Sequence, residues 1–515
     1  MGWLSESEAR VLSALSALAD CNPFLPERIE LERAALGDAF VETGSVWHAE
    51  ADLLRIHPNI PALAARIESL VPELRRRLAE GASARPTELR HYEGAVRHLL
   101  YLRHEPLWFR LALLADDGQS TSERVDGFAD FARDVEHFLT VVDAAKLPGP
   151  VDPAFLFAWG YQIRRAFHFT YRRIHGGSMP AAQLRAAVWQ SIFTWDAARY
   201  RRALIERMGD IPTLVTGPSG TGKELVARAL ALSRFVPFDA RKRVFATDVT
   251  ASFFPVNLSA LSPTLIESEL FGHRRGAFTG AVADRTGWLE TCGSDGTVFL
   301  DEIGELDPGI QVKLLRVLQS RRFQRIGETE ERRFEGKLVA ATHRDLSEQI
   351  AAGRFRADFY YRLCADLIET PTLREQLAEG PGELENLLAV IAARVAGPDE
   401  GPALAEQVRD FVERELGRDY AWPGNVRELE QCVRNVLIRG HYTPHRLGAE
   451  LGADPLAAAL REGALSADAL LRRYCTHVYA RCGSYEEAAR RLGLDRRTVK
   501  AKLDRELLEE LKASR

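Results

Sequence analysis

The sequence has few cysteines and no long apolar run. Its six cysteines are scattered, and no two form a Cys-x-x-Cys pair. This argues against a zinc site or a disulfide framework and favours a reducing cytoplasm. No apolar stretch approaches the ~18 residues that a membrane span needs, so we expect no membrane partner. The first residues, MGWLSESEARVL, lack the basic head and apolar centre of a secretory signal. We therefore expect a cytoplasmic protein.

An excess of positive charge is also missing. The 515 residues carry a formal net charge of -5, with 68 basic and 73 acidic side chains. Because the surface is not uniformly basic, we expect any nucleic-acid binding to be confined to a local patch. The hydrophobic content of 46% is ordinary for a soluble globular protein. This length is enough for about three domains.

The pattern of the chain changes several times along its length. Phe131, Val135 and Phe138 recur at helical spacing in a mostly helical N-terminal part. Short apolar runs then alternate with amphipathic segments, further helical patterns follow, and a soft alanine-rich and glycine-rich stretch precedes an arginine-rich end. The expected divisions are a helical domain at 1–185, an α/β core at 186–375, a helical region at 376–445, a linker at 446–466 and a C-terminal domain at 467–515.

Three apolar runs in the central part end in small, polar or acidic residues. They are TLVTG (213–217), TVFLDE (297–302) and KLVAAT (337–342). Parallel strands in a sheet covered by helices have this pattern, and ligands gather at their carboxyl ends. The sequence therefore predicts a parallel α/β core with a ligand site at that edge.

The strongest local motif is GPSGTGKE (217–224), which follows one of these runs and precedes the amphipathic LVARALAL. In a strand–loop–helix setting, glycines let backbone N–H groups face phosphate oxygens, and the helix N-terminus adds positive potential. Lys223 would reach the β- and γ-phosphates. A glycine turn with a chance lysine fits this setting poorly. We expect ATP to be bound by the whole loop: Gly217, Pro218, Ser219, Gly220, Thr221, Gly222, Lys223 and Glu224. Glu224 stands where the general pattern has a Ser or Thr that ligates magnesium.

An acidic pair follows the buried run FLDE (299–302). Asp301 is expected to bind Mg²⁺, directly or through water, and Glu302 is the candidate base that activates the attacking water. A solvated strand end is the alternative interpretation of such a pair. Phosphoryl transfer also needs positive charge, often from an arginine of a neighbouring subunit that is worth about 10³–10⁵ in rate. Arg356 and Arg362 are candidates, although their spacing alone does not distinguish them from surface arginines.

These motifs resemble the bacterial enhancer-binding proteins, AAA+ ATPases that activate RNA polymerase carrying sigma-54. The resemblance covers roughly residues 190–440. Its most specific element is GAFTGA, preceded by ESELFGH (267–273). In that family the hexapeptide is the tip of a loop that touches sigma-54, and its glycines and an exposed Phe278 would make a mobile apolar tip. A flexible surface turn is the alternative. The resemblance implies a sigma-54 contact through Gly276, Ala277, Phe278, Thr279, Gly280 and Ala281.

The resemblance also implies roles for single residues near the acidic pair. Asn257 matches an asparagine that holds the catalytic glutamate, which corresponds to Glu302. Thr342 and His343 match a nucleotide sensor, although the family usually has asparagine where His343 stands.

Arginines are carried over in the same way. Arg356 and Arg362 match arginines that act on a neighbouring subunit's nucleotide. Arg427, in AWPGNVRELE (421–430), matches a residue of the AAA+ helical lid that senses the γ-phosphate. The family commonly has GKE at the phosphate loop, which accounts for Glu224. One departure is the segment 231–256, which is longer than usual and is expected to form an extra loop or hairpin of unassigned role.

The C-terminal segment SYEEAARRLGLDRRTVKAKL (484–503) reads as two helices around a tight turn at Gly493. Asp495 can cap a second helix, with Val499 pointing inward. A basic helix alone usually just faces solvent, but the segment resembles the Fis-type helix-turn-helix that ends many enhancer-binding proteins. The resemblance implies DNA contacts through Arg496, Arg497, Thr498, Lys500 and Lys502.

The leading hypothesis is an ATP-hydrolysing activator that binds an upstream DNA site, assembles into a ring, expected to be a hexamer, and remodels the closed complex of sigma-54 RNA polymerase. A DNA-binding regulator whose ATPase serves only assembly is a second possibility, which the intact GAFTGA disfavours. A generic protein-remodelling ATPase is a third, which the helix-turn-helix disfavours. Residues 1–185 would form a sensory or partner-binding domain by family analogy, or a purely structural helical module.

Overall fold

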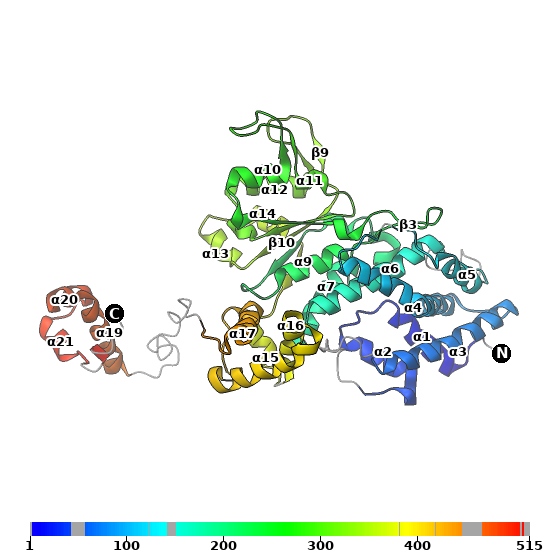
Figure 1. The fold of residues 1–515 in the computed structure, drawn as a ribbon, viewed down its shortest axis with the longest axis horizontal. Coiled ribbons are helices and arrows are strands. Elements are labelled where there is room, and N and C mark those ends of the chain that lie inside the picture. Colours follow the sequence, from blue (N-terminus) through cyan, green and yellow to red (C-terminus); the bar gives the residue numbers. More distant parts are fainter. Residues whose placement is uncertain are drawn as a thin grey trace. The chain divides into compact units, whose positions relative to one another are not determined.

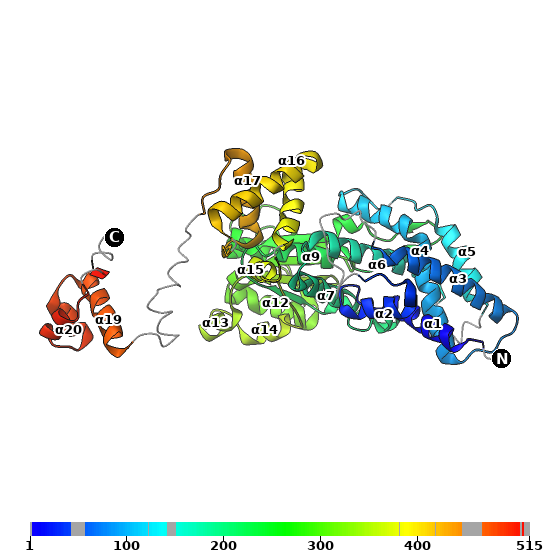
Figure 2. The same ribbon diagram turned by 90° about the horizontal axis from the view of Figure 1, so that it is seen from below.

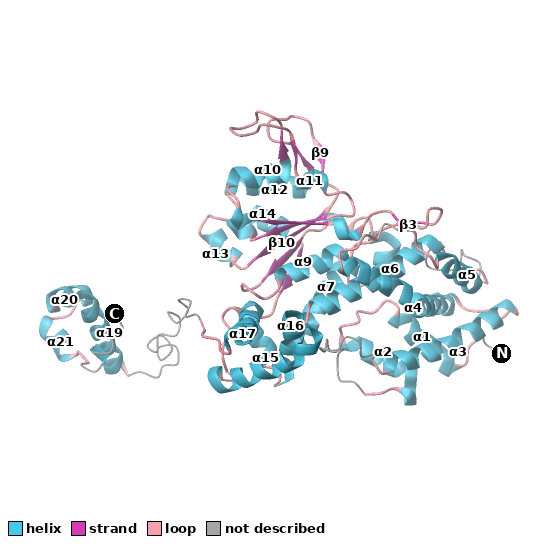
Figure 3. Ribbon diagram, viewed as in Figure 1, coloured by secondary structure: helices cyan, strands magenta, loops and turns pink. Residues whose placement is uncertain are grey.

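The computed structural model describes residues 3–42, 57–121, 123–141, 151–380, 382–417, 419–444, 466–504 and 507–508. The chain divides into two compact units, Met1–His441 and Tyr442–Arg515. Figures 1 and 2 draw the ribbon from two sides, and Figure 3 separates helices from strands. Of the linker predicted at 446–466, only Ser466 lies within the described residues.

The N-terminal part of the first unit is helical, as the periodicity predicts. Local signals set several helix starts: Ser5 and Glu8 form a capping box, and the Asp152 side chain accepts a hydrogen bond from the Ala154 N–H. The elements are α1 (Glu6–Leu18), α2 (Pro26–Leu36), η1 (Gly37–Ala39), α3 (Asn59–Ala79), α4 (Pro86–Asp116), α5 (Phe128–Leu139), α6 (Pro153–Arg173), α7 (Met179–Phe193), α8 (Ala197–Arg199), a π-helical turn at Tyr200–Leu204 and η4 (Met208–Asp210).

The centre of the first unit is a parallel five-stranded sheet with the order β11-β1-β10-β7-β4. Its strands are β1 (Thr213–Thr216), β4 (Phe253–Asn257), β7 (Thr297–Asp301), β10 (Lys337–Thr342) and β11 (Asp366–Glu369). The surrounding elements are α9 (Lys223–Leu232), η5 (Val249–Ala251), η6 (Leu258–Ala260), α10 (Pro263–Phe271), α11 (Trp288–Thr291), η7 (Ile303–Glu305), α12 (Pro308–Ser320), α13 (Leu346–Ala351) and α14 (Ala357–Leu363).

Alternate residues of the central strands enter two different hydrophobic clusters. Leu214, Val298 and Leu338 pack with α10, α12 and α14 on one face of the sheet. Val215 and Val339 pack on the other face, with α9 and with helices of the N-terminal part. This follows from the period of two in a strand, because a strand buried on both faces must be apolar throughout.

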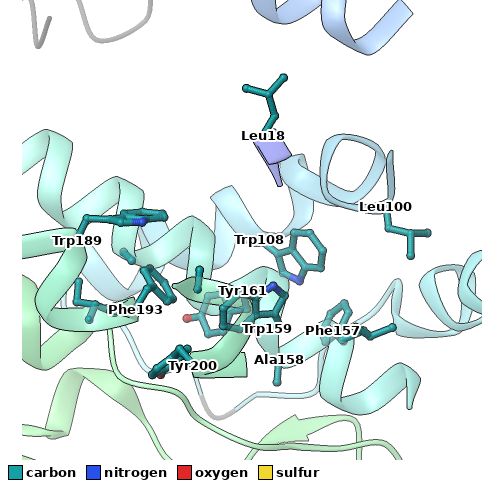
Figure 4. Packing of buried hydrophobic residues seen from close by; sticks show 14 of the residues in the cluster. Leu18, Leu100, Trp108, Phe157, Ala158, Trp159, Tyr161, Trp189, Phe193 and Tyr200 are labelled. Atoms are coloured by element: carbon teal, nitrogen blue, oxygen red, sulfur yellow. The ribbon is translucent and has the colours of Figure 1, made fainter. Parts of the chain in front are cut away.

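The helical N-terminal part and one face of the sheet therefore share a single hydrophobic core. Phe157 and Trp159 of α6 belong to the same cluster as Val339 of β10 and Ile368 of β11. Figure 4 shows part of this cluster around Trp108, Phe157 and Trp159. The division predicted at residue 185 lies inside helix α7, which contacts both α9 and β11.

Short hairpins and a helical region complete the first unit. The hairpins are β2–β3 (Phe238–Asp239 and Val244–Phe245), β5–β6 (Gly272–His273 and Arg285–Thr286) and β8–β9 (Arg322–Phe323 and Arg332–Arg333). The helical region comprises α15 (Leu373–Leu377), α16 (Gly382–Phe411, kinked at Gly397), a π-helical turn at Val412–Leu416 and α17 (Asn425–Arg439).

The second unit contains α19 (Ala467–Cys482), α20 (Tyr485–Leu492) and α21 (Arg496–Ala501). Ala488, Ala489 and Val499 form its small core. Gly493 ends α20 in the left-handed conformation, and Asp495 caps α21 by accepting from the Arg497 N–H, as predicted.

The predicted fold class is confirmed: a helical N-terminal part, a parallel α/β core, a helical lid and C-terminal helices. Within the described ranges, no helix is both long enough and apolar enough to cross a bilayer.

Candidate functional site

The glycine-rich loop joins β1 to α9 at the carboxyl edge of the sheet. Gly217, Gly220 and Gly222 have φ values of 142°, 80° and 91°, which favour glycine. A Cβ on Gly217 would lie 2.2 Å from Thr370 Oγ1, so the loop packs directly against the residue that follows β11. Thr221 Oγ1 also lies 2.6 Å from Thr370 Oγ1. The predicted loop is thus shaped by backbone conformation and by close packing.

Lys223 starts helix α9 and folds back over the loop. Its Nζ donates to the carbonyl oxygens of Gly217 at 2.8 Å and Pro218 at 3.0 Å. Burial lowers the pKa of Lys223, while the charges of Glu302 and Asp301 act in the opposite direction. The ammonium group therefore lies within the field of both acidic residues, and its present partners are weak carbonyl acceptors that an anion could replace.

The acidic pair ends β7, two strands from the loop in the sheet. Burial, and then the neighbouring charge of Glu302, raises the pKa of Asp301. Glu302 has φ 59°, a left-handed conformation that costs a non-glycine residue about 1–3 kcal/mol and is often found at functional sites. The two carboxylates and Lys223 together form a partly buried, mixed-charge cluster.

Glu302 is held by His343, which follows β10. His343 Nδ1 lies 2.7 Å from Glu302 Oε2, and the His343 backbone N–H donates to the same oxygen at 3.4 Å. Thr342 is buried at the end of β10, and its Oγ1 accepts from the Arg344 N–H. Both predicted sensor residues therefore lie beside the acidic pair.

Asn257 lies opposite Asp301 in the register of β4 and β7. Its side chain accepts from the N–H and hydroxyl of Ser259, at 3.0 and 2.8 Å. Asn257 caps the turn that follows its own strand, and the predicted contact with Glu302 is not formed among the described residues. A short side chain that can bond to the backbone two residues on favours this local arrangement.

The helical lid, which comprises α15, α16 and α17, contacts the phosphate loop through the start of α17. Arg427 Nη1 donates to Ser219 Oγ at 3.0 Å, and Asn425 Nδ2 donates to the Ser219 carbonyl at 3.0 Å. A Cβ on Gly220 would lie 2.3 Å from the Gly424 carbonyl oxygen. The predicted sensor Arg427 therefore reaches the loop directly, and any ligand there would lie close to the lid.

Arg356 and Arg362 lie at the ends of α14 rather than at the loop. Arg356 is exposed and pairs with Asp358, with Nη2 2.7 Å from Oδ2. Arg362 Nε donates to the Leu318 carbonyl at 3.3 Å. In the part of the chain that the structure describes, neither contacts the phosphate loop of its own chain. Glu224, on the first turn of α9, is exposed.

The GAFTGA segment forms a closed turn between β5 and β6. The Gly276 N–H donates to the Ala281 carbonyl at 2.8 Å, and the Ala281 N–H to the Phe278 carbonyl at 3.0 Å. Gly276 and Gly280 have φ values of 82° and 102° with no atom near their Cβ positions. Phe278 is half-buried, with its ring centre 4.9 Å from that of His273. The expected exposed tip is therefore corrected: Thr279 is exposed, whereas Phe278 packs against His273.

The predicted DNA-contacting residues lie on and just after α21. Arg496, Arg497 and Lys500 are exposed, and Thr498 is half-exposed. Arg496 Nη1 lies 3.0 Å from Glu486 Oε1. Lys502 caps the end of α21 and pairs with Asp468 of α19, which leaves its side chain 26% exposed. Arg497 and Lys500 are therefore the members of this set that are exposed and that, among the described residues, form no ion pair with a carboxylate.

Three residues of the site were not singled out from the sequence as contacts. They are Thr370 against Gly217, Asn425 beneath the lid, and His343 as the direct partner of Glu302. Asn425 has φ 53° and also accepts from the Leu373 N–H. Asparagine tolerates this conformation, and the PGN turn before α17 is a signal that could have pointed to it.

The residues present fit a nucleotide and a magnesium ion. The loop offers a cradle that only glycine permits, a lysine and an adjacent carboxylate. Among the described residues no group of three or more His, Cys, Asp or Glu side chains could hold a metal ion alone. Mg²⁺ prefers to keep waters and bind one or two carboxylates together with substrate phosphates, a role that Asp301 fits.

Comparisons with known proteins agree with this architecture. The family model described as the sigma-54 interaction domain matches residues 197–369. The transcriptional regulatory protein ZraR of Klebsiella oxytoca is 42% identical over 304 residues, covering 58% of this chain and 64% of that protein. The Nif-specific regulatory protein of Azotobacter vinelandii is 43% identical over 263 residues, covering 50% of this chain and 46% of that protein. Each match thus spans less than two thirds of the relative's length.

Among solved structures, a crystal structure of NtrX from Brucella abortus is 24% identical, with a TM-score of 0.38, and covers 75% of this chain and 80% of that chain. The family match and the motif geometry agree on the central part of the chain. Residues 197–369, which include the phosphate loop, the acidic pair and the GAFTGA turn, are a sigma-54 interaction domain.

Proposed function

We propose that this protein is a sigma-54-dependent transcription activator that hydrolyses ATP, binds upstream DNA through its C-terminal helices, and remodels the closed promoter complex of sigma-54 RNA polymerase as a ring, expected to be a hexamer. The observation that carries the proposal is the occurrence, in one α/β core, of a phosphate loop closed by a lid and a GAFTGA turn on an extension of the same core.

At the nucleotide site, Lys223 would exchange its two loop carbonyls for phosphate oxygens. This exchange is favourable because a charge-assisted bond to phosphate is stronger than a bond to a neutral carbonyl. Asp301 would hold Mg²⁺, which supplies charge compensation on the phosphates. Glu302, which follows β7 with a positive φ, would accept a proton from the attacking water.

The bond between His343 and Glu302 supports a restraint on this base. His343 occupies the position at which the family sensor usually has asparagine, and it reaches Glu302 from the neighbouring strand end. We propose that His343 holds Glu302 in the nucleotide-free protein and that hydrolysis requires this bond to rearrange. Arg356 and Arg362, which lie away from the loop of their own chain, would act on the site of a neighbouring subunit.

A loop substitution tests the proposal, because it separates hydrolysis from activation. Thr279→Ala changes an exposed hydroxyl of the GAFTGA turn and leaves the nucleotide site untouched. We expect ATP hydrolysis within about twofold of the wild type and loss of open-complex formation with sigma-54 polymerase. Val282→Ala, at a residue that is 84% exposed just outside the hexapeptide, is the matched control and should retain both activities.

Normal activation by Thr279→Ala would reject contact through this turn. Absence of hydrolysis in the wild-type protein would reject the ATPase itself.

A further inference from the structure

The C-terminal end of the phosphate-loop helix α9 is held by side chains of α6. A helix leaves its last carbonyl groups without intrahelical partners. Arg165 donates to the Leu232 carbonyl from Nη1 and to the Arg234 carbonyl from Nη2, both at 2.7 Å. Gln162 Nε2 donates to the intervening Ser233 carbonyl at 3.0 Å. Three successive carbonyls at the end of α9 are thus bound by the N-terminal helical part.

Arg165 has no other strong partner that would explain its burial. Arg165 is 1% exposed, and among the described residues it forms no ion pair with a carboxylate. Its guanidinium lies 4.5 Å from the centre of the Tyr161 ring. Burial lowers the pKa of Arg165. A buried cation is costly unless its donors are bonded, and a cation at a helix C-terminus is favoured by the helix dipole. The position of α9 and that of Arg165 are therefore mutually dependent.

The extra segment between α9 and β4 forms the β2–β3 hairpin, and it docks on the same helical part. The Phe245 ring lies 4.4 Å from that of Tyr161, and the Phe238 ring lies 4.7 Å from that of Phe157. The Val125 N–H donates to the Arg243 carbonyl at 2.8 Å. The hairpin therefore fills the aromatic core of the helical part and fixes it beside α9.

We infer that Arg165 and Gln162 are positioning residues for the nucleotide site, and that the β2–β3 hairpin helps to dock the helical part onto the ATPase core. A helix is stiff, so a shift at the end of α9 is carried to its first turn, where Lys223 lies. A cavity of about 760 Å³ opens beside Gln162, Leu230 and Arg234, which gives this contact room to rearrange. This inference rests on the proposed function only for its hydrolysis readout.

The test compares nucleotide binding and turnover of full-length variants at a temperature where all are folded. Arg165→Met leaves two carbonyls without their donors. We expect the KM for ATP and the Kd of a fluorescent ADP analogue to rise about tenfold, with Arg165→Lys intermediate. A purely structural role would lower the active fraction, and therefore kcat, while KM and Kd stayed unchanged. Phe245→Leu, which loosens the hairpin, should raise KM in the same direction.

Tyr92→Phe is the matched control, because it removes a buried hydrogen bond to the Phe138 carbonyl within the helical part, away from α9. Its KM and Kd should equal those of the wild type. If Arg165→Met does not fold, Arg165→Lys and Gln162→Met carry the same comparison. Wild-type KM and Kd in the folded Arg165 variants would overturn the inference. Should the wild type hydrolyse no ATP, the activator proposal would fall, while binding of the ADP analogue would still decide this one.

Discussion

The contact between the lid and the phosphate loop gives a prediction whose size follows from the geometry. Gly220 has φ 80°, and a Cβ there would lie 2.3 Å from the Gly424 carbonyl oxygen and 3.0 Å from Arg427 Cβ. An ordinary carbon–oxygen contact is about 3.3–3.6 Å, so Gly220→Ala must displace the start of α17 by about 1 Å. A misplacement of this size at a catalytic site can cost about 10²-fold in rate.

Gly440→Ala separates this displacement from backbone strain. Gly440 ends α17 with φ 72°, and no atom lies within 4 Å of its Cβ position. Alanine is disfavoured at positive φ, so each substitution should lower the free energy of unfolding by about 1 kcal/mol, and Gly220→Ala adds the cost of displacing the Gly424 backbone. Only Gly220→Ala should also lower kcat/KM for ATP, by about 100-fold. The assays are urea denaturation and steady-state hydrolysis. Equal hydrolysis by the two variants would refute the seating of the lid on the loop.

Further predictions concern the acidic pair, its restraint and the second unit. Glu302→Gln should retain binding of an ATP analogue and lose about 10²–10⁴-fold in hydrolysis; near-normal turnover would exclude Glu302 as the base. Burial and the Glu302 charge raise the pKa of Asp301. The folded, nucleotide-free protein therefore binds a proton at Asp301 more tightly than the unfolded chain does, and ionisation of Asp301 lowers the free energy of unfolding. Asp301→Asn should therefore raise the Tm of the nucleotide-free protein at neutral pH. The increase should shrink as the pH falls through the pKa of Asp301. A Tm equal to that of the wild type across this pH range would contradict the destabilising role of the Asp301 charge. His343→Ala should raise kcat by about tenfold with little change in KM, since it releases Glu302 and leaves the phosphate loop unaltered; an unchanged or lower kcat would argue against the restraint. Arg497→Ala should weaken DNA binding and reduce the slope of log K against log salt by about 1, and an unaltered slope would place this residue outside the interface.

The parts of the site that depend on local sequence could be predicted. Gly217, Gly220 and Lys223 adopt the expected strand–loop–helix arrangement because their conformations are set by glycine and by the neighbouring strand. Asp301 and Glu302 follow a buried apolar run, so their place at the carboxyl edge was also predictable. The Asp495 cap of α21 is a local signal of the same kind.

Contacts between distant segments could not be predicted in this way. The Asn257 side chain is hydrogen-bonded to the nearby Ser259 instead of to Glu302, and His343 lies beside Glu302. Which side chain contacts Glu302 depends on how neighbouring strand ends face each other, and the local sequence does not encode this. Strand β11 could not be predicted from an apolar run, because its sequence DLIE is not continuously apolar. β11 is an edge strand, in which Leu367 is exposed and Ile368 is buried.

The shared core of the helical part and the sheet is the largest feature that periodicity alone did not reveal. α6 is apolar around much of its circumference, with Phe157, Trp159 and Tyr161 all buried. A helix of this kind is usually packed on several sides, which was a usable signal for burial against a second layer. Part of the surface that packs against α6, however, comes from the β2–β3 hairpin. Phe157 contacts Phe238 and Phe245, which lie more than 80 positions away in the sequence, so periodicity within α6 could not predict these contacts.

We propose that nucleotide chemistry at Lys223 and Glu302 is transmitted to sigma-54 through the GAFTGA turn. The most direct measurement is binding of purified sigma-54 to the full-length protein, in a gel-filtration or native-gel assay, with ADP and aluminium fluoride mimicking the transition state of hydrolysis. We expect a stable complex with this mimic, none with ADP alone, and none for Thr279→Ala under either condition. Transmission through the turn would be refuted by a wild-type protein that binds the mimic but fails to retain sigma-54, or by a Thr279→Ala variant that retains sigma-54 as well as the wild type does.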